Sequence, residues 1–246
     1  MEVHHHSHTA RKKWTHYFWE FLMLFLAVFC GFLAEYQLEH KIEKDREKQF
    51  IKSLVADLQE DEIIIQKNIT GNRANIALMD NFLTIVSTPS LLKEQGNNAY
   101  YMARVGPRII SLVTNNKTFE QLKNSGSFRL IHSNEAANKI MEYYNQLPQI
   151  TKLEDLYFEE FAHYKTIASK LFEPTVFRAM ENEDGTIKRE ANNPQLRTSN
   201  PEILKEFGLY IVYMNGTIRS IAPMEENLLK TGKDLINYLK EKYHLD

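Results

Sequence analysis

The sequence predicts a mostly α-helical protein, in which one N-terminal transmembrane helix continues into an elongated antiparallel helical bundle. An apolar stretch near the start of the chain is long enough to cross a bilayer. Three later stretches repeat apolar residues every three or four positions, which is the period of an amphipathic helix. Helix breakers are scarce, with 9 Gly and 7 Pro in 246 residues, well below the roughly 12% that is usual.

The predicted membrane segment is Tyr17–Tyr36, about 30 Å of helix. Its interior contains one charged residue, Glu20, and the run from Phe21 to Ala34 contains none. Aromatic residues stand at both ends, as in the interfacial belts of membrane helices; they are Trp14, Tyr17, Trp19 and Tyr36. We therefore expect an uncleaved membrane anchor.

This segment has three other interpretations. A cleaved signal peptide needs a small-x-small site after the apolar run, and residues 29–34 offer no clean one. A lipoprotein signal would use Cys30, but the bulky Phe29 precedes it. A buried core helix stays open, because the charge-free run is only about 14 residues long.

The flanking charges predict the orientation of the anchor. The basic residues Arg11, Lys12 and Lys13 precede it, whereas acidic and basic residues are interleaved after it. By the positive-inside rule the N-terminus stays in the cytoplasm, so we expect a single-pass protein of a bacterial inner membrane with a periplasmic C-terminal domain. The expected parts are a cytoplasmic His/basic tail (1–13), a transmembrane helix (14–36), a charged juxtamembrane helix (37–49) and an extracytoplasmic bundle (50–246).

Three long helices are predicted for the bundle. The first continues from the anchor, with a weaker stretch around residues 39–48, and ends near Pro89. The second begins after Ser133 as N-cap, kinks at Pro148 and closes at Pro174. The third begins at Pro201 and is bent or briefly broken at Pro223, although a hairpin turn at residues 215–216 is the alternative.

The region from Ser90 to His132 is more broken. Thr118–Gln121 resembles a capping box, which would open a short helix that stops at Gly126. Arg108–Val113 fits a short strand or a helix. Residues 182–200 are predicted to form a polar loop.

Two stretches, residues 19–61 and 118–144, carry a resemblance to a known family. The first is an apolar anchor followed by a charged helix. The second joins a short helix, a Ser-Gly stop, an apolar pair and a capped helix ending in Tyr143-Tyr144. Both resemble a broad family of uncharacterised single-pass membrane proteins with a periplasmic helical domain, from Bacteroidetes-type bacteria. That resemblance implies location and architecture, and no activity.

The N-terminal tail carries the weak candidates for a metal site, His4, His5, His6 and His8. Neutral imidazoles bind transition metals. No cysteine or carboxylate cluster completes a closed site in this stretch, so a histidine tail without a metal function is the simpler interpretation. No cofactor is expected.

One face of the anchor carries His16, Glu20, Ala27 and Gly31. His16 and Glu20 are four residues apart and can pair, and Ala27 and Gly31 form a small-xxx-small pair that permits close approach of another helix. The predicted role is a docking face for self-association or for another envelope protein. Proton coupling through Glu20 and an ordinary interfacial acid are the alternatives.

The composition and the motifs bound the function. A net charge of -2 argues against nucleic acid as a partner. No hydrolase, zinc-protease or phosphate-loop motif is present, so a non-enzymatic protein is expected. The first hypothesis is a membrane-anchored periplasmic interaction or scaffold protein whose partners are the lipid bilayer and an envelope protein or itself. The alternative is a periplasmic ligand-sensing bundle that signals through a membrane partner and needs a polar-lined pocket.

Overall fold

The computed structural model describes residues 14–245 and confirms a mostly α fold, 81% helical, with no strands among those residues. The chain divides into two units, of which the first ends at Phe50 and the second begins at Ile51. The elements are α1 (Trp14–Ser87), α2 (Pro89–Glu94), α3 (Gly96–Val105), α4 (Lys117–Asn124), the 3-10 helix η1 (Ser127–Leu130), α5 (Asn134–Tyr144), α6 (Leu147–Leu171), α7 (Pro174–Ala179) and α8 (Pro201–Tyr243).

The first unit contains the N-terminal part of α1. Its most apolar stretch has a mean hydropathy of 2.0, and none of that stretch is buried. By length and composition it is able to span a membrane. The weakening expected around residues 39–48 is not present, because α1 is helical without interruption.

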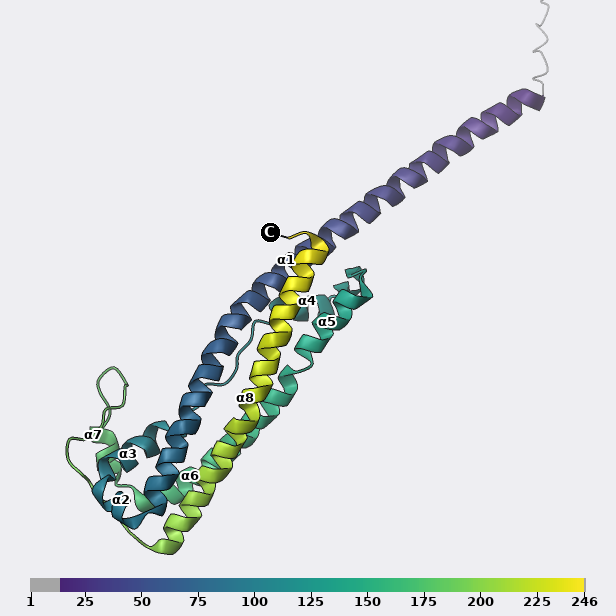
Figure 1. Cartoon of the computed structure of the whole chain (residues 1–246). Coiled ribbons are helices and arrows are strands. Elements are labelled where there is room, and N and C mark those ends of the chain that lie inside the picture. The colour runs from purple at the N-terminus through teal and green to yellow at the C-terminus, as the bar shows by residue number, and fades with distance from the viewer. Residues whose placement is uncertain (1–13, 246) are drawn as a thin grey trace, which may run out of the picture. The chain divides into compact units, whose positions relative to one another are not determined.

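The second unit is an antiparallel bundle in which α8 lies beside α1 and α6 (Figure 1). Two contacts mark the relative positions of α1 and α8: Glu62 pairs with Lys233 at one end, and the ring of Phe82 contacts that of Phe207 at the other. Thr217 of α8 donates to Glu160 of α6. Sequence numbers rise along one helix as they fall along its neighbour, which is the predicted antiparallel arrangement.

Aromatic side chains fill the core where α1, α6 and α8 meet. Tyr164 and Phe207 lie 4.8 Å apart between ring centroids, and Phe172 packs against the same Phe207 at 5.7 Å. Tyr157 and Tyr164 are buried, so the apolar stripe predicted for the second helix is core. Burying an aromatic side chain of this size stabilises the fold by about 1.5–3 kcal/mol.

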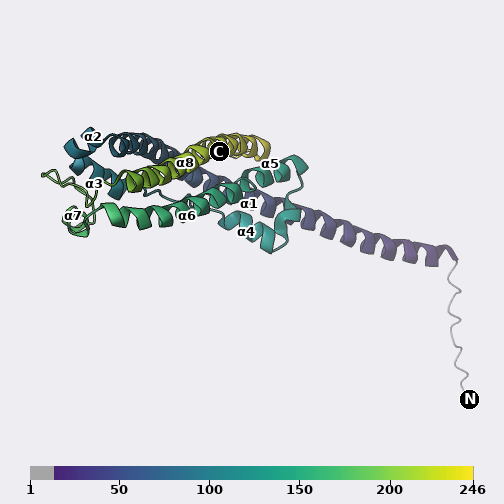
Figure 2. The same ribbon diagram turned by 90° about the horizontal axis from the view of Figure 1, so that it is seen from below.

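The short helices α2, α3 and α7 gather at the end of this unit where α1 ends and α8 begins (Figure 2). The hydroxyl of Tyr100 on α3 accepts a hydrogen bond from the backbone N–H of Glu173 and donates to the carbonyl of Gln195. Sequence analysis identified neither α2 nor α3, because each is too short to show a helical period.

Two expectations about proline need correction. Pro148 does not kink a continuous helix: the chain breaks between α5 and α6, and Pro148 stands in the first turn of α6, where no backbone N–H is needed. At Pro223 a bend or a brief break was expected, and the break is absent, because α8 is continuous through that residue. The hairpin alternative at residues 215–216 is wrong.

The helix caps were predicted with mixed success. The Ser133 hydroxyl accepts from Ala136 N–H, as expected. Asn200, for which no cap was predicted, accepts from Glu202 N–H at the start of α8. Gly126 has a left-handed φ of 67° and ends α4. The capping box is wrong: α4 starts at Lys117 and the N–H of Thr118 donates to Asp57 of α1.

Gly96 and Gly216 give a matched test of this packing. A Cβ at Gly96 would overlap the carbonyl oxygen of Pro194, whereas a Cβ at Gly216, inside α8, meets nothing within 4 Å. Gly96→Ala should lower the free energy of unfolding by about 1–3 kcal/mol. Gly216→Ala should raise it by up to about 1 kcal/mol, because alanine favours helix. Urea unfolding of the detergent-solubilised chain measures both, and equal effects would contradict the packing described.

Candidate functional site

The predicted anchor face lies within the first unit. His16 Nε2 is 3.3 Å from Glu20 Oε1, so the expected pair forms, and both side chains are about half exposed. A Cβ at Gly31 would meet nothing within 4 Å, which leaves the Ala27–Gly31 side of the helix open to another helix. The docking role of this face stays a prediction.

The metal candidates His4, His5, His6 and His8 lie outside the described residues. Between residues 14 and 245 no group of three or more His, Cys, Asp or Glu side chains could hold a metal ion. Glu160 and His163 lie three residues apart on α6 and each contacts α8: Glu160 accepts from Thr217, and His163 stacks on Tyr210 at 6.0 Å between ring centroids.

The segment from Pro107 to Asn116 is neither a strand nor a helix, contrary to both predictions for residues 108–113. It runs along α1 in the opposite direction and is held by α1 side chains. Asn75 donates to the carbonyl of Arg108, and Asn68 donates to that of Ile110. Asp61 accepts from the backbone N–H of Asn115 at 2.6 Å.

Asp61 is the most enclosed of these groups, with no exposed surface. Besides Asn115, the hydroxyl of the buried Tyr143 donates to it at 2.9 Å. Burial raises the pKa of Asp61, and these two hydrogen bonds oppose that rise. Burial and the neighbouring carboxyl also raise the pKa of Tyr143, so this tyrosine remains a hydrogen-bond donor.

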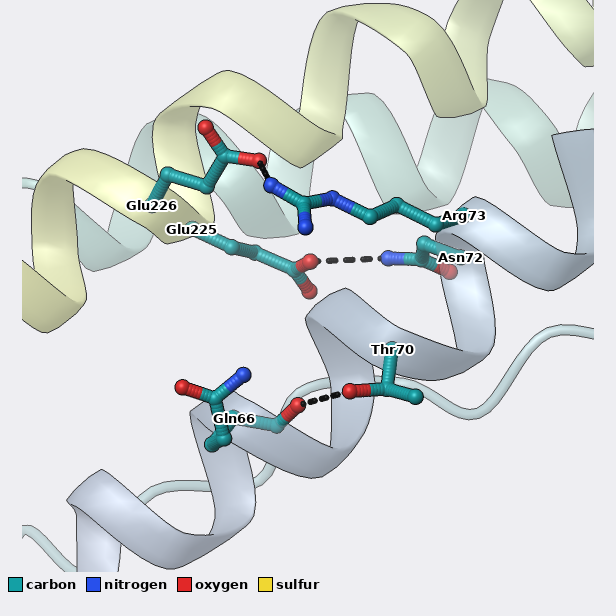
Figure 3. Close-up of polar contacts among 6 residues, drawn as sticks. All are labelled: Gln66, Thr70, Asn72, Arg73, Glu225 and Glu226. Carbon is teal, nitrogen blue, oxygen red and sulfur yellow. Dashed lines mark hydrogen bonds and ion pairs between the residues drawn. The ribbon is translucent and has the colours of Figure 1, made fainter.

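A second buried carboxyl, Glu225 of α8, faces α1 (Figure 3). Asn72 donates to its Oε2 at 2.8 Å, whereas its Oε1 has no partner among the described residues. Burial raises the pKa of Glu225 to about 7, a rise that the Asn72 hydrogen bond opposes and the Glu154 carboxyl adds to. The next residue, Glu226, instead forms an exposed ion pair with Arg73.

Glu154 of α6 is the third buried carboxyl described for the second unit, and it accepts from the backbone N–H of Leu112 at 2.7 Å. Burial raises its pKa as well. None of the three carboxyls lines the cavities described next, so no bound substrate could reach them there. Asp61 and Glu154 hold the 107–116 segment against α1 and α6, and Glu225 joins α8 to α1.

Sequence analysis missed this polar face entirely. Asp61, Asn68 and Asn75 are spaced by seven residues, the distance that returns a helix to nearly the same side. Polar residues at that spacing among apolar positions were the sequence signal that could have indicated a buried polar face on this helix. Their acceptors and donors lie 33–54 residues away, which no local pattern reveals.

Two open cavities lie at the end of the second unit that holds α2, α3 and α7. The larger, about 860 Å³, is bordered by α1, α2, the 195–199 segment and α8. The smaller, about 450 Å³, is bordered by α3, α6 and α7. Both have volumes typical of ligand pockets, roughly 300–1,000 Å³. Neither was predicted, because their walls come from segments distant in sequence.

No family model, curated protein or solved structure matches this chain. The resemblance to the Bacteroidetes-type membrane family therefore stays an expectation based on residues 19–61 and 118–144. The functional argument rests on the geometry of the two units.

Glu225 predicts a specific pH dependence of stability. Because its pKa is higher in the folded chain than the ordinary 4.5, the folded state binds this proton more tightly. Its stabilising contribution is full below about pH 4.5 and falls as the pH rises to about 7. Glu225→Gln should therefore stabilise the chain at pH 8 by about 1–3 kcal/mol and change little at pH 4.5.

The control is Glu226→Gln, which removes the neighbouring exposed carboxylate and a surface ion pair worth at most about 1 kcal/mol. Thermal unfolding of both variants and of the unaltered chain at pH 4.5 and pH 8 makes the comparison. A Glu225→Gln variant that loses as much stability between these pH values as the unaltered chain would show that Glu225 does not titrate as described.

Proposed function

We propose that this chain is a membrane-anchored interaction protein of a bacterial inner membrane, with its N-terminus in the cytoplasm and its helical bundle in the periplasm. The observation that carries the proposal is the first unit's apolar stretch, none of which is buried by the described protein. Apolar surface of this extent is stable only when lipid or another protein covers it.

The anchor supplies one docking surface. The sides of the helix that carry Phe21, Phe25 and Phe29 are bulky, whereas Ala27 and Gly31 leave a shallow strip on another side. Helices in lipid associate most closely through such small residues. His16 and Glu20 extend the same face with a polar pair, so a second anchor helix, of this chain or of a partner, would pack here.

The bundle supplies a second docking surface at the larger cavity. Its wall is largely apolar and includes Leu83, Leu92 and Leu204. Three cations, Lys93, Arg197 and Lys205, and no acidic residue line it. The exposed α8 residues Leu209 and Val212 continue its apolar surface. This chemistry suits a partner's apolar segment flanked by acidic side chains.

A second candidate function is a ligand-sensing bundle that signals through a membrane partner. The observation favouring it is the smaller cavity, which has a polar rim between helices, as a sensing bundle requires. The two functions are compatible, because the cavity and the anchor face belong to different units.

The lone Cys30 tests the anchor in the unaltered chain. Embedded in lipid, its thiol should resist a membrane-impermeant maleimide in isolated membranes and react after detergent solubilisation. A mature chain that lacks Cys30, or that is labelled equally in both states, would contradict the anchor.

In a Cys30→Ser background, Gly31→Cys should form oxidative dimers if the face self-associates, and Phe29→Cys on the opposite side should not. Dimers through both would show contact without a preferred face.

A further inference from the structure

The smaller cavity combines an apolar floor with a cationic rim. Tyr164, Ala168 and Phe172 form the buried floor. The rim contains four basic residues and no acidic one; they are Arg104, Arg108, Lys165 and Arg197. These residues come from α3, α6 and the segments that follow α3 and α7, so the fold itself assembles the charge.

Two of the rim cations already have acidic partners outside the cavity lining. Arg104 lies 3.1 Å from Glu181, and Arg197 lies 3.7 Å from Glu173. Arg108 and Lys165 form no ion pair within residues 14–245. The rim thus presents two positive charges without an ion-pair partner among the described residues.

The cations lie at the boundary between the apolar floor and solvent. Lys165 Nζ is 4.7 Å from the Phe161 ring centroid, and the Arg104 guanidinium carbon is 5.9 Å from that of Phe177. Arg104 Nε is buried and has no hydrogen-bond partner among the described residues. A buried donor without an acceptor is unfavourable.

We propose that this cavity binds an organic dianion with a flat apolar body, such as an aromatic dicarboxylate. The body would lie on the floor of Tyr164 and Phe172, and the carboxylates would meet Arg108 and Lys165. Guanidinium groups bind carboxylates with two parallel hydrogen bonds. An inorganic anion would leave the floor uncovered, and an uncharged aromatic compound would leave the rim unneutralised. This ligand is the one that the proposed sensing function would detect, so the proposal rests on that function. It does not depend on docking at the anchor face or at the larger cavity.

The test is calorimetric titration of naphthalene-2,6-dicarboxylate into the full chain, reconstituted in phosphatidylcholine nanodiscs, with empty nanodiscs as the blank. The expected Kd is on the order of 1–100 µM. The double variant Arg108→Gln/Lys165→Gln should weaken binding at least tenfold. The control Lys170→Gln/Arg178→Gln removes the same charge from α6 and α7 at residues that do not line the cavity, and should leave the Kd unchanged.

A second variant tests the floor without altering the charge. Ala168 is buried beneath the cavity, so Ala168→Leu should occlude it and also abolish binding. Naphthalene-2,6-diol and inorganic phosphate, which each carry half of the proposed recognition, should bind at least tenfold more weakly than the dicarboxylate.

Three results would overturn the proposal: no binding by the unaltered chain, an equal loss in the control variant, or phosphate binding as tight as that of the dicarboxylate. Because the titration measures binding alone, a chain that binds the dianion but shows no signalling would overturn the sensing function and leave the site intact. Failure of the anchor is detected separately by Cys30 labelling.

Discussion

The buried polar face of α1 is the constraint on which the rest of the second unit depends. A helix face that buries Asp61, Asn68 and Asn72 is stable only if each polar group finds a partner. The 107–116 segment supplies backbone groups to Asp61 and Asn68, and α8 supplies Glu225 to Asn72. Packing α8 in another register would leave these groups unpaired, so polar pairing selects one arrangement from the many that apolar packing alone would allow.

The long helices were predictable because their information is local. Apolar periodicity, Ser133 as a cap and Pro201 at the start of α8 all act within a few residues. The failures were non-local. The Thr118 region looked like a capping box, but its N–H is satisfied by Asp57, 61 residues away. The extended segment, the buried carboxyls and both cavities likewise depend on partners that only the assembled bundle brings together.

The same physical logic links the two proposed roles. In the proposed role of the first unit, lipid covers its exposed apolar surface, and the small residues Ala27 and Gly31 would determine where another helix approaches closely. In the second unit the core is filled by aromatic rings, and the two larger cavities lie at the end built from the short helices α2, α3 and α7. Their lining is cationic and apolar together, whereas the buried carboxyls Asp61, Glu154 and Glu225 form hydrogen bonds within the unit.

The claim that α1 organises the bundle is tested most directly by residue-resolved hydrogen exchange of the full chain. The backbone amides of Leu112, Asn115 and Thr118 donate to Glu154, Asp61 and Asp57. The account predicts that these three amides exchange much more slowly than that of Val113, although Leu112 and Asn115 lie outside any helix. Equally fast exchange of all four would contradict it, because the segment would then not be held by the carboxylates.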